Sequence, residues 1–243
     1  LPVPPGELVR AGEALPGIAA GVVKAQVPVG GRGKAGGIRV ARDPATIRAA
    51  AVNVLGMTIR GHAVRAIRVE RLIDFAYEAY FSFTLDAGAA AVTVMMSPHG
   101  GIEVEDESTR ADLAREMVAL DADAMRGAVE RLAARMPEAL RAPLGEAGAQ
   151  LIPAFFENEA LLLEINPLFV HADGSWVIGD TKLAIDENAL SRRPHLAALI
   201  ADNEDLYREA ALKLAQGFDY VELDPAGDIG LITTGAGLSM QFV

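Results

Sequence analysis

The chain has 243 residues with a formal net charge of −11, a pI of about 4.8 and no cysteine. The acidic charge argues against nucleic-acid binding, which needs a basic face, and the lack of cysteine excludes disulfides, thiolate nucleophiles and cysteine-ligated metals. No apolar run reaches the ~18 residues of a membrane-spanning helix. Composition therefore predicts a cytoplasmic protein of one large domain or two lobes, partnered by neither nucleic acid nor membrane.

The most informative stretch near the start is residues 22–38, which read VVKAQVPVGGRGKAGGI. It contains five glycines, at positions 30, 31, 33, 36 and 37. Glycine lets the backbone take positive φ angles and approach a ligand without a Cβ in the way, so main-chain N–H groups can point at phosphate oxygens. Lys24, Arg32 and Lys34 add positive charge. The stretch predicts a hairpin that contacts an anion.

Spacing decides among three nucleotide-binding motifs. A Walker A loop fails because Pro28 stands where its first glycine belongs, and Ala35, which has no hydroxyl, follows Lys34. Three of the glycines match G-x-G-x-x-G, but a strand-like sequence follows where a Rossmann motif needs a helix. The remaining interpretation is a glycine-rich flap between two strands, with Lys24 reaching the phosphates of a nucleotide. The alternative is a flexible surface hairpin.

The elements that follow alternate between helical and strand-like patterns. A helix is predicted from an N-cap at Asp43, with proline in the first helical position, to about Leu55. Strands are predicted at residues 66–71, 77–85 and 89–96. From residue 108 to about 159 the apolar period lengthens to about 3.6 residues, which predicts two or three helices. The predicted breaks are near Asp121 and between Pro137 and Gly148. This order predicts an α+β fold in two lobes.

A second informative stretch, residues 161–185, predicts two strands joined by a turn at Asp173 and Gly174. Side chains alternate between the two faces of a strand, so Glu164 and Asn166 share a face. The residues that lie opposite them depend on the length of the loop.

A two-residue loop would pair Asp180 with Pro167, whereas a three-residue loop with Gly174 in the left-handed region pairs Asp180 with Asn166. We expect the three-residue loop. It places an amide oxygen beside a carboxylate, and these are ligands that Mg²⁺ accepts together with nucleotide phosphates. The alternative is a hairpin with a polar, solvent-facing surface.

Five segments together closely resemble one enzyme family. They are VVKAQVPVGGRGKAGG, EINPL, the D-x-K that follows, NALSRRP at residues 188–194 and GDIGLITTGAGLSM near the end. The chain resembles the β subunit of ADP- or GDP-forming succinyl-CoA synthetase and its malate-CoA ligase relatives, least at about residues 8–21 and 106–149. The resemblance implies a two-lobed ATP-grasp fold at residues 1–226, with a smaller lobe at about 5–72 and a larger lobe at about 73–226. Residues 227–243 would begin a flavodoxin-like CoA-ligase domain, so we expect a fragment of a longer protein.

The resemblance also implies roles for individual residues. The nucleotide-binding positions of the family match Lys24, Gly31, Arg32, Gly33, Glu70, Ile73 and Glu78. Asn166 and Asp180 match the two Mg²⁺ ligands, in agreement with the pairing above, and Glu164 matches a glutamate at which a phosphohistidine of the partner arrives. Thr234 stands at a substrate-contacting position that is asparagine in the family, and Pro28 and Ile73 depart from the family pattern as well.

By the same resemblance, ATP or GTP with Mg²⁺ phosphorylates a histidine of an α subunit. The phosphate then passes to a small dicarboxylic or hydroxycarboxylic acid, and CoA displaces it. The implied assembly is a heterodimer or heterotetramer, in the cytoplasm or, in a eukaryote, the mitochondrial matrix. Two alternatives stay open: an ATP-grasp ligase without phosphohistidine, and a non-catalytic nucleotide-binding assembly module. The intact Lys24, Asn166 and Asp180 favour the catalytic interpretation.

Overall fold

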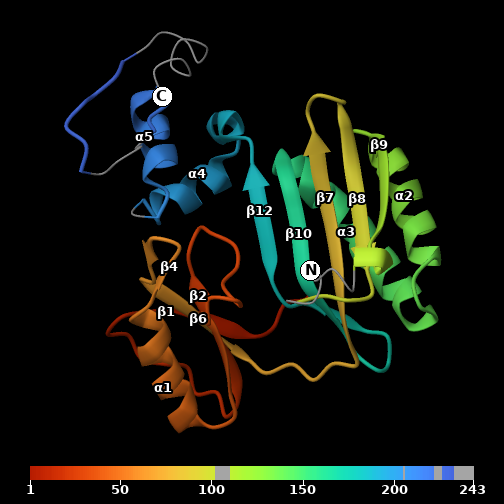
Figure 1. Cartoon of the computed structure of the whole chain (residues 1–243), viewed down its shortest axis with the longest axis horizontal. Coiled ribbons are helices and arrows are strands. Elements are labelled where there is room, and N and C mark those ends of the chain that lie inside the picture. Colours follow the sequence, from red (N-terminus) through yellow and green to blue (C-terminus); the bar gives the residue numbers. More distant parts are fainter. Residues whose placement is uncertain (102–109, 205, 222–225, 233–243) are drawn as a thin grey trace. The chain divides into compact units, whose positions relative to one another are not determined.

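Figure 1 shows the computed structural model of the chain, which describes residues 1–101, 110–204, 206–221 and 226–232. By its internal contacts the chain divides into two compact units, Leu1–Leu196 and Ala197–Val243. The strands of the described residues all belong to the first unit. Thr234 and most of the expected flavodoxin-like start lie outside the described residues.

The first sheet is antiparallel, and its strands lie in the order β1–β6–β2–β3. Their bounds are β1 (Gly6–Arg10), β2 (Gly21–Gln26), β3 (Ile38–Ala41) and β6 (Ala66–Arg71). Helix α1 (Pro44–Leu55) packs against β2, β3 and β6. It buries Ile47, Ala51 and Val54, which recur on one helical face and join the core under this sheet.

The predicted start of α1 is confirmed. The Asp43 carboxylate accepts hydrogen bonds from the backbone N–H groups of Ala45 and Thr46, at 2.9 and 2.8 Å. The Thr46 hydroxyl contacts the backbone N–H of Asp43 in return, which completes a capping box. Pro44 occupies the first helical position, where a missing N–H costs nothing.

The second sheet lies in the order β11–β10–β7–β8–β9, with β12 also paired to β10. Its strands are β7 (Tyr77–Asp86), β8 (Ala91–Ser97), β9 (Ala114–Ala119), β10 (Ala160–Val170), β11 (Trp176–Ile178) and β12 (Thr181–Ile185). Helices α2 (Ala122–Ala134) and α3 (Glu138–Glu157) pack on it, as Figure 1 shows. The core between them is centred on Phe81, Phe83 and Phe155, whose rings meet edge to face.

Shorter elements complete the described chain. A two-stranded hairpin joins β4 (Thr58–Ile59) to β5 (His62–Ala63). Two 3₁₀ helices cover Arg110–Asp112 and Glu187–Arg192, and two α-helices follow, α4 (Pro194–Ala201) and α5 (Arg208–Gln216). Among the described residues, no helix is long and apolar enough to cross a membrane.

Two sheets, each with helices on it and its own core, confirm the α+β class. The strands predicted at residues 66–71 and 77–85 are confirmed to within one residue, and the one predicted at 89–96 begins two residues later, at Ala91. Residues 108 and 109, the start of the predicted helical region, lie outside the described residues.

The prediction for the helical region is wrong in two places. Ala114–Ala119 forms strand β9, where a helix was expected. Its AREMVA sequence buries only Ala114 fully, so its hydrophobic alternation is weak and its residues are mostly good helix formers. Helix α3 also runs unbroken through Pro143 and Gly148, because these residues pack into the core instead of ending the helix.

The strand predicted up to residue 185 is interrupted at Gly179 and Asp180, so that it forms β11 and β12. The Gly179 N–H donates to Pro167 O at 2.9 Å. A Cβ at position 179 would lie 2.5 Å from Cε2 of Phe169, so only glycine fits this approach. The interruption leaves the Gly179 carbonyl and the Asp180 side chain available for other contacts.

Candidate functional site

The glycine-rich segment between β2 and β3, residues 27–37, is here called the flap. Its predicted place between two antiparallel strands is confirmed, since Lys24 pairs with Ile38 across the hairpin. Its turns are held by three backbone hydrogen bonds of 2.8–3.1 Å: Ala35 N to Gly31 O, Gly36 N to Gly33 O and Gly37 N to Arg32 O. Gly31 and Gly36 have φ of 78° and 77°, which disfavours other residues at these positions. The flap therefore has a defined backbone.

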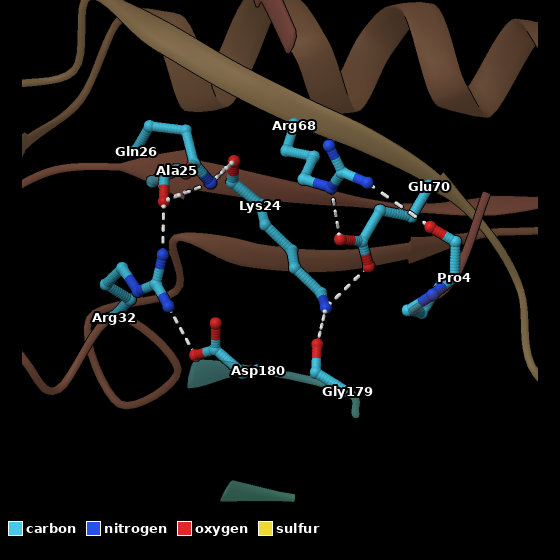
Figure 2. A network of polar contacts seen from close by, with 9 residues as sticks. All are labelled: Pro4, Lys24, Ala25, Gln26, Arg32, Arg68, Glu70, Gly179 and Asp180. Carbon is cyan, nitrogen blue, oxygen red and sulfur yellow. Dashed lines mark hydrogen bonds and ion pairs between the residues drawn. The ribbon is translucent and has the colours of Figure 1, made fainter. Parts of the chain in front are cut away.

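Lys24 projects from β2 toward the break between β11 and β12 (Figure 2). Its Nζ lies 2.6 Å from Oε2 of Glu70 and donates to Gly179 O at 2.5 Å. Oε1 of Glu70 accepts from Nε of Arg68 at 2.7 Å. Lys24 and Glu70 are only 7% and 5% exposed, so each buried charge is compensated by its neighbours.

Arg32 ties the flap to the second sheet. Its Nη1 donates to Ala25 O at 3.0 Å, while Nη2 forms an ion pair with Oδ2 of Asp180 (Figure 2). The structure thus brings both cations predicted at the phosphates, Lys24 and Arg32, to the Gly179–Asp180 corner. That corner carries one of the two predicted metal ligands.

The predicted pairing of Asn166 with Asp180 is confirmed. Strand β10 pairs with both β11 and β12 in the register that places these two residues opposite each other, and Asn166 N donates to Asp180 O at 3.1 Å. The loop closes with His171 N donating to Ser175 O at 2.8 Å, and Gly174 has φ of 84°. The loop therefore has three residues, as expected, and the two-residue alternative is excluded.

Two further predicted residues meet at Gly101, just after β8. The Gly101 N–H donates to Oδ1 of Asn166 at 2.5 Å, and the amide nitrogen of Asn166 donates to Gly101 O at 3.2 Å. A Cβ at position 101 would lie 2.8 Å from Oε2 of Glu78, so this carboxylate also lies against Gly101. The amide of Asn166 and the carboxylate of Glu78 therefore border the same backbone segment.

The residues at this corner suit a hard, oxygen-seeking cation. Asn166 supplies an amide oxygen and Asp180 a carboxylate, from facing positions on adjacent segments. Among the described residues no group of three or more His, Cys, Asp or Glu side chains could hold a metal ion. The chemistry fits Mg²⁺, which takes one or two protein oxygens and completes its shell with water and phosphate.

Glu164 lies on β10 opposite Lys182 of β12 and Ser82 of β7. Its Oε2 accepts from the Tyr80 hydroxyl at 3.3 Å, and that hydroxyl also contacts Oγ of Ser82 at 3.1 Å. Burial raises the pKa of Tyr80 to about 12, so the phenol keeps its proton at physiological pH. Tyr80 can therefore hold the Glu164 carboxylate in place as a neutral donor.

The other predicted positions are more scattered. Gly31, Arg32 and Gly33 lie in the flap, and Ile73 is half-buried in the segment between β6 and β7. Thr234 lies outside the described residues.

Sequence reasoning missed Arg68, Gly179 and Gly101 as parts of this site. The place of Arg68 could have been predicted, because residues two apart on a strand share a face and Arg68 therefore lies beside Glu70. Contacts at Gly179 and Gly101 join distant parts of the chain and leave no local pattern.

The chain is similar in sequence and in fold to several known proteins. The ATP-grasp domain family matches residues 3–170. An ADP-forming succinate–CoA ligase subunit beta from Bacteroides thetaiotaomicron is 37% identical over 225 residues, which are 90% of this chain and 58% of that protein. The corresponding subunit from Chloroflexus aurantiacus is 38% identical over 227 residues, again 90% of this chain and 58% of that protein. The chain thus spans less than two thirds of these relatives.

Among solved structures, that of ATP citrate lyase from Methanothrix soehngenii in complex with citrate and coenzyme A superposes with a TM-score of 0.70. The match covers 98% of this chain and 60% of that one, at 17% sequence identity. At this identity the likeness concerns the fold.

Proposed function

Because the chain belongs to the ATP-grasp domain family, we propose that it is the nucleotide-binding part of the β subunit of an acid–CoA ligase. The reaction joins a small dicarboxylic or hydroxycarboxylic acid, such as succinate or malate, to CoA, with cleavage of ATP or GTP to the diphosphate and phosphate. A phosphohistidine of an α subunit carries the phosphoryl group in this proposal. The ATP-grasp part is assigned to residues 1–226, with lobes meeting near residue 72, and a CoA-ligase domain begins at residue 227.

One observation carries the proposal: two cations of the flap hairpin, Lys24 and Arg32, converge on the Gly179–Asp180 corner beside Asn166. Phosphoryl transfer needs charge neutralisation and in-line alignment more than covalent help from the protein. A glycine-rich flap between two strands supplies both, because its backbone can approach the phosphates and the side chains of Lys24 and Arg32 can neutralise them.

In this proposal Asn166 and Asp180 hold the magnesium ion, which neutralises charge on the nucleotide phosphates. Lys24 and Arg32 bind the phosphates after exchanging their present partners, Glu70 and Asp180, for phosphate oxygens. Glu70 and Glu78 are assigned to the base and ribose side of the nucleotide. Ile73, in the segment between β6 and β7, is assigned to nucleotide binding as well. Glu164, held by Tyr80, is assigned to the place where the partner's phosphohistidine arrives, and Thr234 to the acid substrate.

The test is calorimetric titration of the protein with ATP and with GTP, each with and without Mg²⁺. We expect one nucleotide to bind in a Mg²⁺-dependent manner. Asp180→Ala should abolish the Mg²⁺ dependence while the circular dichroism spectrum and the melting temperature stay close to those of the wild type. An assay with the α subunit, CoA and either succinate or malate would then identify the acid.

Two outcomes would contradict the proposal. Unchanged Mg²⁺-dependent affinity in Asp180→Ala would refute the metal assignment. If the protein bound neither nucleotide, the nucleotide-binding role itself would fall. A matched control is Asp173→Ala, because Asp173 lies in the loop before β11, where its carboxylate accepts hydrogen bonds from the backbone N–H and the hydroxyl of Ser175.

A further inference from the structure

We propose that Arg60 is a further phosphate-binding residue beside the flap, an inference that rests on the proposed nucleotide-binding function. Arg60 lies in the two-residue turn of the β4–β5 hairpin, between Ile59 and His62, which pair with each other. The hairpin also packs Ile59 against the flap, where a Cβ on Gly37 would lie 2.6 Å from Cδ1 of Ile59.

The side chain of Arg60 lies directly against the flap. A Cβ built on Gly31 would be 2.8 Å from Nη2 of Arg60 and 3.2 Å from its Cζ. The guanidinium therefore occupies the space beside Gly31 that any larger residue would need. Gly31 directly precedes Arg32, the cation that pairs with Asp180, so the Arg60 guanidinium lies against the residue next to Arg32.

Unlike Lys24 and Arg32, Arg60 is not committed to a partner among the described residues. Within the described ranges of the chain it forms no hydrogen bond or ion pair, and its side chain is exposed. Lys24 and Arg32, in contrast, are already paired with the carboxylates of Glu70 and Asp180. Arg60 offers a planar fork of donors that matches a phosphate group at once.

The backbone at Arg60 gives an independent reason to look for a function. Arg60 has φ of 48° and Gly61 has φ of 86°, so both turn positions are left-handed. Asparagine, aspartate and glycine are the residues that such a turn favours at its first position. Arginine is disfavoured there, so local structure does not explain its presence, whereas a phosphate contact does.

A second unpaired cation lies on the flap from the other sheet. A Cβ on Gly30 would be 4.0 Å from Nζ of Lys182, and Lys182 also has no partner within the described residues. Arg60 and Lys182 thus approach two consecutive glycines of the flap from different elements. The ligand class that fits is the polyphosphate of a nucleoside di- or triphosphate, because these two cations together with Lys24 and Arg32 carry four positive charges, whereas a monophosphate carries at most about two negative charges.

The test is Arg60→Asn, chosen because asparagine is favoured at this turn position and the variant should fold at least as well as the wild type. Titration with AMP, ADP and ATP in the presence of Mg²⁺ should show about tenfold weaker ATP binding, the loss of one charge-assisted contact. AMP affinity should be unchanged, and the melting temperature should stay level or rise. Arg60→Lys should recover part of the ATP affinity.

The matched control is Arg42→Asn, an exposed arginine just beyond the end of β3 that is remote from the flap. It should bind ATP like the wild type. Wild-type ATP affinity in Arg60→Asn, or an equal loss for AMP and ATP, would overturn the role of Arg60 while the proposed function stands. Failure of the wild type to bind any nucleotide would overturn both.

Discussion

Lys24 and Glu70 are two charged residues that the fold removes almost completely from water, and their contacts are unequal. Glu70 touches both Lys24 and Arg68, whereas Lys24 has Glu70 and one backbone carbonyl, that of Gly179. A buried charge that loses its only opposite charge is costly, while one that keeps a second partner is less so. The pair should therefore respond asymmetrically to mutation.

This asymmetry gives the first prediction. Glu70→Ala should lower the free energy of unfolding by about 3 kcal/mol, because Lys24 is left buried with no acid beside it. Lys24→Met should cost less, since Glu70 keeps Arg68, although it should abolish nucleotide binding under the proposed function. Urea denaturation of both variants measures the difference. Equal losses in the two variants would show that Arg68 does not compensate Glu70.

Arg32 and the proposed metal ion compete for the Asp180 carboxylate, which gives the second prediction. Arg32→Met should tighten the binding of Mn²⁺, used as a paramagnetic probe in place of Mg²⁺, by about threefold without nucleotide, as expected for the loss of one partly buried ion pair. The same variant should weaken nucleotide binding. Asp180→Ala is the control that should bind no Mn²⁺ at this position. An unchanged or lower Mn²⁺ affinity in Arg32→Met would argue against competition.

For individual residues, the sequence predicted only those contacts that follow from spacing along the chain. The facing of Asn166 and Asp180 followed from the loop length and the two-residue period of a strand, and the structure confirms it. The contacts of Lys24 with Gly179 and of Asn166 with Gly101 join residues that are 155 and 65 positions apart. Such contacts depend on how the sheets pack, which no local pattern records.

Helix α3 shows why glycine is an ambiguous signal at the scale of elements. A break was predicted between Pro137 and Gly148, and Pro137 does precede the helix, but α3 then continues through Gly148. A Cβ at position 148 would lie 2.8 Å from both Cε2 of Phe81 and Cγ1 of Val129. Both neighbours are fully buried. Glycine is needed at this position for close packing, and its poor helix propensity is overridden by the contacts of the helix with β7 and α2.

The third prediction uses two glycines of the same helix. Gly148→Ala should destabilise the protein by about 1–3 kcal/mol through overpacking of the core, although alanine is the better helix former. Gly145→Ala should stabilise it by about 0.5–1 kcal/mol, because its Cβ would meet only Cβ of Ala133 at an ordinary 3.8 Å. Thermal or chemical unfolding of the pair tests the argument. Stabilisation by both changes would mean that the core relaxes around position 148.

The fourth prediction concerns the start of α1. Hydrogen bonds from the Thr46 backbone and hydroxyl lower the pKa of the Asp43 carboxyl below its usual value. A group with a depressed pKa in the folded state stabilises that state above its unfolded pKa of about 4, and the stabilisation is lost as the pH falls through the folded pKa. Asp43→Asn keeps a capping side chain without a titrating group. The wild type should therefore lose more stability than Asp43→Asn between pH 5 and about 3, measured by thermal unfolding.

At the scale of the first unit, Leu1–Leu196, two separate hydrophobic cores are joined near the flap by polar contacts. Lys24 and Arg32 belong to the first sheet and its hairpin, while Gly179 and Asp180 belong to the second. Composition and element order predicted an α+β chain with two lobes, since each amphipathic set needs its own core. They could not predict that the link between the sheets consists of the same side chains that form the candidate site.

This arrangement gives the last prediction. A nucleotide that takes over the contacts of Lys24 and Arg32 binds both sheets at once, so it should stabilise the two cores together. At a free concentration 100 times its Kd, Mg-ATP should add about 2.7 kcal/mol and raise the Tm by roughly 5–10 °C. Hydrogen exchange should show slower exchange at amides of both β2 and β10. Adenosine lacks the phosphates and is the control, and protection confined to one sheet would mean that the nucleotide does not bridge them.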